Sequence, residues 1–174
     1  METIGKRETG RLGPVAAGIR IGAAVLDRAW ALVFGPPDLG AVDFATLRRR
    51  RTPNDALVCP EGFCASARAD MVAPEFPVPA ERLRAVLAEV ALAEPGAERL
   101  PAEEGRDRFL VRTRFFRFPD TVDAQVLPRG EGRATLALYS RSQIGGSDFG
   151  VNRARLTRWL KQVEARAADE RSSA

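Results

Sequence analysis

The sequence of 174 residues contains no histidine at all. This absence excludes Ser-His-Asp and Cys-His catalysis, and it excludes every metal site that depends on a histidine ligand. It also removes the side chain that most often acts as a general base near neutral pH. The sequence therefore argues against the common hydrolase mechanisms, and it predicts no catalytic residue, no metal site and no cofactor.

Lysine is scarce as well, because arginine supplies nearly all of the 27 basic residues, which stand against 23 acidic ones. The formal net charge of +4 is modest, and aromatic residues make up only 7% of the chain. Nucleic-acid binding modules usually combine a clear basic excess with aromatic side chains, so the composition argues against a nucleic-acid partner. The apolar content of 45% is sufficient for one folded domain with an N-terminal extension.

Long apolar runs are missing too, because Arg20, Asp27 and Arg28 interrupt the largely apolar stretch between residues 14 and 34. A charge at the centre of a membrane-spanning helix costs about 2.5–3.5 kcal/mol, and three of them outweigh the gain from the apolar residues present. We therefore expect residues 13–35 to form an amphipathic helix. Such a helix can lie on a membrane surface, pack on the domain or a partner, or serve as a degenerate anchor.

The segments around this helix are expected to be irregular. Residues 1–12 are charged and rich in glycine, which predicts a disordered lead-in. Residues 36–52 are expected to be a linker, and their four-arginine run, 48–51, is either solvated or in contact with anionic lipid headgroups. Residues 169–174 are expected to be a tail.

The remaining residues, 53–168, are predicted to form an α+β domain. The proline-rich stretch 53–79 reads as an extended segment over the domain, because proline fixes φ and removes a hydrogen-bond donor. A helix is predicted to begin at Pro79, and a second one covers residues 149–168. We expect an antiparallel sheet of four to five strands covered by these two helices. Its predicted strands are 98–100, 108–118, 121–127 and 133–142.

Cysteine occurs only twice, and Cys59 and Cys64 flank the sequence Pro-Glu-Gly-Phe. Two cysteines without histidine cannot complete a tetrahedral zinc site, and the spacing is not that of a C-x-x-C redox motif. Three alternatives remain open: a small-loop disulfide, two buried thiols, or redox chemistry. The disulfide would require an oxidising compartment such as a periplasm.

The predicted strands alternate apolar and polar residues, which places the polar side chains on one face of the sheet. These side chains either form solvated cross-strand ion pairs or line a groove for an anion such as a phosphate or a carboxylate. Arg141 is expected to contact Asp120, Asp123 or Asp148. The candidate ligand-binding residues of this face are Arg112, Arg114, Asp123, Tyr139 and Arg141.

A turn of Gly145, Gly146, Ser147 and Asp148 precedes the last helix. It is not a P-loop, and we expect Ser147 or Asp148 to cap the helix. Free N–H groups at a helix start also suit a phosphate, although Asp148 would oppose an anion there. Arginine near a helix start opposes the helix dipole, so pairing with Asp148 or Asp120 is expected. Four residues of this region complete the set of ligand-binding candidates: Ser142, Asp148, Asn152 and Arg155.

Three motifs also carry a family resemblance: PNDALVCPEGFC (53–64), FRFPDTVD (116–123) and LYSRSQIGGSDFGVNRARLTRWL (138–160). In this order, over residues 34–160, the chain resembles a bacterial and chloroplast family that is defined only as a domain of unknown function. The resemblance implies relatives but no activity, substrate or cofactor.

These observations favour an uncharacterised, envelope-associated, non-enzymatic binding or accessory module. It is expected to recognise an anionic or lipid-like ligand and to contact a membrane surface through residues 14–51. The alternative is an enzyme that acts on an anionic small molecule through the arginine-lined sheet face. The expected location is the cell envelope, either on a membrane or in the periplasm, and the cytoplasm is the alternative. The sequence sets no oligomeric state.

Overall fold

The computed structural model describes the backbone of residues 14–173 and the side chains of residues 22–169. The chain divides into two compact units, with the boundary between Gly35 and Pro36. The first unit contains α1 (Pro14–Phe34), which lies within the range 13–35 predicted to be helical. Among the described helices none is both long and apolar enough to cross a membrane. The lead-in expected at residues 1–12 lies outside the described residues.

The second unit is built on a six-stranded mixed sheet with the strand order β2-β1-β6-β5-β4-β3. All neighbouring strands are antiparallel except β1 and β2, which are parallel. The α+β class was predicted correctly, whereas the prediction of four to five strands, all antiparallel, was wrong. The strands are β1 (Asp55–Cys59), β2 (Met71–Val72), β3 (Ala97–Leu100), β4 (Arg106–Arg112), β5 (Pro119–Pro128) and β6 (Ala134–Ser142).

The strands that the sequence analysis missed, β1 and β2, come from the proline-rich segment 53–79. The prolines of this segment lie outside both strands, where a missing N–H does not interrupt the ladder. Ala56, Leu57 and Val58 are fully buried in β1, which pairs with β6. A continuous apolar run is typical of a strand covered on both faces, and that pattern lacks the alternation on which the prediction relied.

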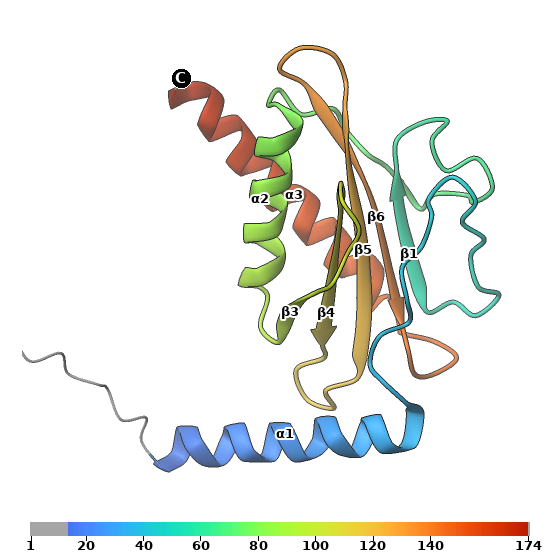
Figure 1. Cartoon of the computed structure of the whole chain (residues 1–174), viewed down its shortest axis with the longest axis vertical. Helices are drawn as coiled ribbons and strands as arrows, with labels where there is room; N and C mark the ends of the chain where they lie inside the picture. Colours follow the sequence, from blue (N-terminus) through green and yellow to red (C-terminus); the bar gives the residue numbers. More distant parts are fainter. Residues whose placement is uncertain (1–13, 174) are drawn as a thin grey trace, which may run out of the picture. The chain divides into compact units, whose positions relative to one another are not determined.

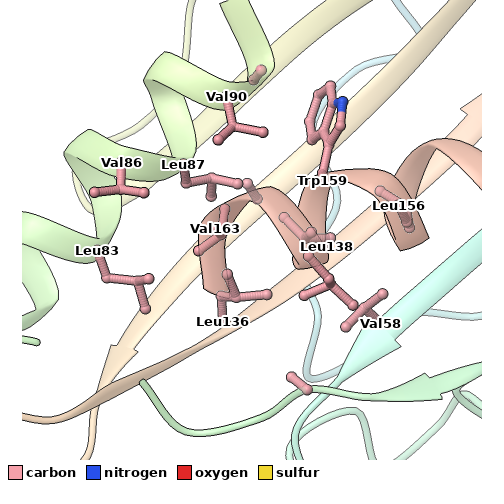
Figure 2. Close-up of a cluster of buried hydrophobic side chains, with 14 of the residues drawn as sticks. Val58, Leu83, Val86, Leu87, Val90, Leu136, Leu138, Leu156, Trp159 and Val163 are labelled. Carbon is pink, nitrogen blue, oxygen red and sulfur yellow. The ribbon is translucent and has the colours of Figure 1, made fainter. Parts of the chain in front are cut away.

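Two helices lie side by side on one face of the sheet (Figure 1): α2 (Ala80–Ala93) and α3 (Val151–Ser173). α2 begins directly after Pro79, as predicted. α3 continues to Ser173, so most of the expected tail is helical. Figure 2 shows the core between the helices and the sheet, where α2, α3, β1 and β6 all contribute buried side chains. Its labelled members are Val58, Leu83, Val86, Leu87, Val90, Leu136, Leu138, Leu156, Trp159 and Val163.

Residues 36–52 cover the opposite face of the sheet. Val42, Phe44 and Leu47 are buried there, in a second apolar cluster that includes Tyr139 of β6. From the sequence, this segment was expected to be a linker, because its scattered apolar residues form no recognisable period. Its apolar side chains nevertheless pack on this face of the sheet. They therefore decide which charged side chains of the face remain accessible to solvent.

The two cysteines belong to the same cluster. Cys59 at the end of β1 and Cys64 in the following loop form a disulfide, with their Cα atoms 6.2 Å apart. This is one of the three alternatives that the sequence left open. The disulfide closes a short loop, and it lies on the side of the sheet that residues 36–52 cover.

Candidate functional site

The three motifs that carry the family resemblance meet at one end of the sheet. Asp120 at the start of β5 pairs in register with Ser142 at the end of β6. Asp55 at the start of β1 pairs with Arg141 on the other side of β6. The turn after β6 then leads into α3. The starts of β1 and β5, the end of β6 and the start of α3 therefore lie in one region.

A buried polar network occupies this region, and Arg155 of α3 is its centre. The Arg155 guanidinium donates to Oδ2 of Asp120 at 2.7 Å, and the two side chains are 2% and 1% exposed. It also donates to Oγ of Ser140 at 3.0 Å and to Oδ1 of Asn152 at 2.8 Å. Pairing with Asp120 was one of the two contacts expected for an arginine so early in the helix.

Asn152 extends this network to the first motif. Its side-chain amide donates to the carbonyl of Asn54 at 3.1 Å and to Oγ of Ser142 at 3.0 Å. Asn54 in turn donates to the carbonyl of Gly145 at 2.8 Å, which holds the glycine turn against β1. Asp148 caps the helix as predicted, because its carboxylate accepts from the backbone N–H of Asn152 at 2.8 Å.

An apolar pocket of about 350 Å³ opens beside the network. Asp120 and Ser142 line it from the sheet. The other lining residues come from the loop between β4 and β5, from the glycine turn and from the start of α3. The apolar ones among them are Phe116, Phe118, Ile144, Phe149 and Val151.

Asp120, which lines this pocket, has a buried carboxylate oxygen without a hydrogen-bond partner among the described residues. Its Oδ2 is bonded to Arg155, whereas Oδ1 is buried and has no hydrogen-bond partner among the described residues. Leaving a buried polar group unpaired costs about 1–3 kcal/mol, so such groups are rare and usually have a reason. A molecule in the pocket that donates a hydrogen bond to Oδ1 would remove this cost.

Both loops that frame the pocket hold a non-glycine residue in the left-handed region. Arg117 has a φ of 53° and Phe149 has a φ of 52°. Such backbone costs about 1–3 kcal/mol per residue, and it tends to cluster at functional sites. Thr113 stabilises the first loop, since its hydroxyl accepts from the N–H of Phe118 at 2.9 Å. This turn ends β4 at Arg112, well before the predicted end at residue 118.

A second pocket of about 310 Å³ adjoins the first and shares Thr113 and Val151 with it. It is lined by Arg112, Arg114 and Arg155, which were all selected from the sequence, and by Glu94 and Pro95. Arg112 pairs with Glu98 at 2.7 Å. Arg114 lies in the turn after β4 and not on a strand, so its predicted place on the sheet face was wrong.

The structure separates the nine candidate ligand-binding residues into two groups. The pockets and the polar network bring together Arg112, Arg114, Ser142, Asp148, Asn152 and Arg155. The opposite sheet face holds the other three, Asp123, Tyr139 and Arg141. Asp120 and Asp123 belong to different groups because an odd spacing along a strand points side chains to opposite faces.

On that opposite face the charges are compensated by acids from distant segments. Arg141 lies 3.6 Å from Oδ2 of Asp123, which is one of the contacts predicted for it. Arg108 donates to Oδ1 of Asp123 at 3.0 Å and also pairs with Asp38. The hydroxyl of Tyr139 donates to the carboxylate of Asp55 at 2.6 Å. The excess of arginine seen in the strands alone is therefore balanced inside the fold.

Burial has the largest effect on the pKa values of Asp123, Tyr139 and Arg141. Burial raises the pKa of Asp123, although Arg141 and Arg108 act in the opposite direction. Burial likewise lowers the pKa of Arg141. The pKa of Tyr139 is raised, first by burial and then by its hydrogen bond to Asp55. All three shifts disfavour the charged form, as expected where residues 36–52 exclude solvent.

Comparison with known proteins agrees with the motifs. Residues 54–163 match a family described as protein of unknown function, DUF1499. The chain belongs to this family. No protein with a curated description is similar to it. Among solved structures, it is similar to the crystal structure of TTHA0849 from Thermus thermophilus, with 13% identity and a TM-score of 0.34 over 67% of this chain and 98% of that one.

The DUF1499 match contains every residue of the polar network, including three that the sequence analysis did not select as ligand-binding candidates. Asn54, Asp120 and Ser140 all lie in the quoted motifs, which was the available signal. Asp120 was expected to be a partner for an arginine and was not selected as a ligand-binding residue. Whether its Oδ1 finds a hydrogen-bond partner depends on which face of β5 the side chain occupies and on which segments cover that face. The motif alone does not contain this information.

Proposed function

We propose that this DUF1499 chain is an envelope-associated, non-enzymatic binding module that holds a lipid-like anionic amphiphile in the two adjoining pockets. The observation that carries the proposal is an apolar pocket lined by Asp120, whose buried Oδ1 has no hydrogen-bond partner among the described residues. The ligand class follows from the chemistry of the two pockets, taken in turn.

The first pocket favours an apolar body. Its volume of about 350 Å³ lies near the lower end of the range typical of small-molecule sites, about 300–1,000 Å³. Phe116, Phe118 and Phe149 supply aromatic walls. A short alkyl segment or a comparable apolar group fits such a lining, whereas a fully polar metabolite would lose its hydration without compensation.

The polar groups of the two pockets favour a ligand whose head group carries a hydrogen-bond donor and a negative charge. Oδ1 of Asp120 can only accept, so the ligand should place a hydroxyl or amine donor there. Arg114 of the adjoining pocket favours an anionic group a short distance away, because guanidinium groups bind carboxylate and phosphate well. A hydroxyl-bearing acidic amphiphile satisfies both requirements.

Two further features support the cell envelope as the location. The Cys59–Cys64 disulfide is the kind of bond that persists in oxidising compartments. The amphipathic helix α1 and the run Arg48–Arg51 suit a surface with anionic lipids, so we propose membrane contact through residues 14–51. The alternative of an enzyme on an arginine-lined sheet face has less support, because residues 36–52 cover that face.

Calorimetric titration with three soluble probes tests the proposal: 3-hydroxydecanoate, decanoate and 3-hydroxybutyrate, each below its micelle concentration. We expect 3-hydroxydecanoate to bind best, decanoate to bind more weakly because it lacks the donor for Asp120, and 3-hydroxybutyrate not to bind because it lacks the apolar body. Equal binding of decanoate and 3-hydroxydecanoate would contradict the role of Asp120. Absence of binding by both would contradict the proposed function.

A matched pair of variants ties the result to the pocket. Ile144→Trp fills the first pocket, and it should weaken binding of 3-hydroxydecanoate at least about tenfold, or about 1.4 kcal/mol. Leu92→Trp adds the same side chain at an exposed position of α2 and should leave the affinity unchanged. If both variants bind like the unaltered protein, the amphiphile binds elsewhere.

A further inference from the structure

Three large aromatic side chains beside the first pocket are exposed to solvent. Phe115 is 82% exposed, Phe116 is 67% exposed and Phe149 is 95% exposed. Phe116 and Phe149 both line the pocket, so the two loops that carry these residues meet at its mouth. Single exposed apolar residues are common on protein surfaces, but a group of phenylalanines at one place marks an interaction site.

The loop that carries two of these phenylalanines is basic. Residues 112–118 read Arg-Thr-Arg-Phe-Phe-Arg-Phe and contain no acidic residue. Arg114 is exposed, and its guanidinium carbon lies 5.9 Å from the centre of the Phe115 ring. Arginine near an anionic membrane contributes about 1 kcal/mol of attraction per residue, and phenylalanine supplies apolar surface that is buried at the boundary between headgroups and acyl chains.

We propose that the loop 114–117 and Phe149 form a docking tip that inserts into the headgroup region of an anionic bilayer. A lipid surface is the occupant that these residues fit, because exposed phenylalanines lie next to exposed Arg114 in a segment without acidic residues. The tip requires no particular contact geometry from its partner, only apolar depth and negative charge.

The position of the tip also suggests where the ligand comes from. Because Phe116 and Phe149 belong both to the tip and to the pocket lining, insertion would bring the pocket mouth to the lipid. An amphiphile could then pass from the bilayer into the pocket without crossing water. This last step rests on the proposed function, whereas the docking of the tip does not.

Phe115 separates the two proposals experimentally, because it belongs to the tip but does not line the first pocket. The test is flotation of the full-length, oxidised protein with vesicles of phosphatidylcholine alone and of phosphatidylcholine and phosphatidylglycerol in equal parts. We expect binding to the anionic vesicles and much weaker binding to the neutral ones. Phe115→Ser should lower the partition coefficient on anionic vesicles about fivefold or more.

Leu92→Ser is the matched control, because it removes an exposed apolar side chain on α2 and should leave vesicle binding unchanged. Phe115→Ser should also leave the affinity for 3-hydroxydecanoate unchanged, whereas Ile144→Trp should lower that affinity and leave vesicle binding intact. Failure of the pocket and failure of the tip are thereby distinguishable.

Helix α1 could contribute to the same flotation result, so the comparison is repeated with Leu32→Asp and Val33→Asp, which alter exposed apolar residues of α1. If Phe115→Ser weakens vesicle binding in the protein that carries Leu32→Asp and Val33→Asp, the result supports the docking tip. If Phe115→Ser has no effect in either background, if this background binds no vesicles, or if neutral and anionic vesicles bind equally, the proposed tip is wrong.

Discussion

The guanidinium of Arg155 in α3 lies 2.7 Å from the carboxylate of Asp120 in β5, and both side chains are almost completely buried. The two residues lie far apart in the sequence and join the helix layer to the sheet. Ser140 and Asn152 satisfy further donors of the same guanidinium. The ion pair therefore has a structural role, while Oδ1 of Asp120 has no hydrogen-bond partner among the described residues.

Arg155→Ala should destabilise the protein strongly. Removing one partner of a buried ion pair leaves the other charge unpaired, which costs about 3–5 kcal/mol. Arg158→Ala is the control, because Arg158 lies about one turn along in the same helix, is exposed and pairs with Glu94 at the surface. Its change should stay within about 0.5 kcal/mol. Urea denaturation measures the free energy of unfolding of both variants. Equal losses would show that the buried Asp120 pair stabilises the protein no more than the exposed pair does.

Arg141→Ala should lower the free energy of unfolding by more than about 1 kcal/mol. Arg141 is mostly buried, lies beside Asp123 and donates to the backbone carbonyls of Leu39 and Gly40, so it holds residues 36–52 on the sheet. Arg133→Ala should be nearly neutral, because the Arg133–Glu75 pair is exposed. Thermal melting compares the two variants. An unchanged melting temperature for Arg141→Ala would mean that this tie is unimportant.

Asp38 should make stability depend on acid pH. Its hydrogen bond with Arg108 lowers its pKa below the ordinary value of 3.8, although partial burial opposes this. The contribution of Asp38 is therefore fully present above pH 3.8 and is lost as the pH falls through the lowered pKa of the folded state. Asp38→Asn should destabilise the protein at neutral pH, and this difference should shrink towards zero in strong acid. Urea denaturation over a pH series measures it, and a difference independent of pH would contradict the pairing.

The disulfide should stabilise the second apolar cluster. Replacing both Cys59 and Cys64 by serine should lower the free energy of unfolding by about 2 kcal/mol, because the unfolded chain gains freedom when the loop opens. Dithiothreitol should destabilise the natural protein by a similar amount and leave the double variant unaffected. If reduction does not change the unfolding curve, the bond contributes nothing to stability.

Helix α1 should bind anionic membranes without spanning them. A chain that begins at Asp38 lacks α1, and it should float less with anionic vesicles than the full-length protein does. Sodium carbonate should release the full-length protein from membranes. Equal flotation of both chains would contradict a membrane role for α1, and retention in carbonate would indicate an embedded helix.

Some elements could be predicted from the sequence because their causes are local. Pro79 starts α2, and the apolar spacing from Leu83 to Val90 gives it one buried face. Asp148 caps α3 from just before the helix, so the motif alone contains that contact. The nearness of the cysteines likewise made a disulfide one of the expected alternatives.

Only the tertiary structure decided the extent of the sheet and the accessibility of its faces. β1 pairs with β6, far away in the chain, and its buried run carries no strand period. Val42, Phe44 and Leu47 of residues 36–52 cover one face together with side chains of the loop after β1. Neither result can be read locally, because burial depends on which distant surfaces are brought into contact.

The same reason explains the candidate site. From the sequence alone, the motifs identified the charged strand residues and Ser142, Asp148, Asn152 and Arg155. They did not show which of these side chains a ligand can reach and which are covered by other segments. Asp38, from outside the strands first considered, pairs with Arg108 on the covered face, and Asp55 pairs with Arg49 of the covering segment. Asp120 keeps an unpaired oxygen beside a pocket formed by two distant loops. Charge and residue type are properties of the sequence, whereas compensation and burial arise only when remote segments meet.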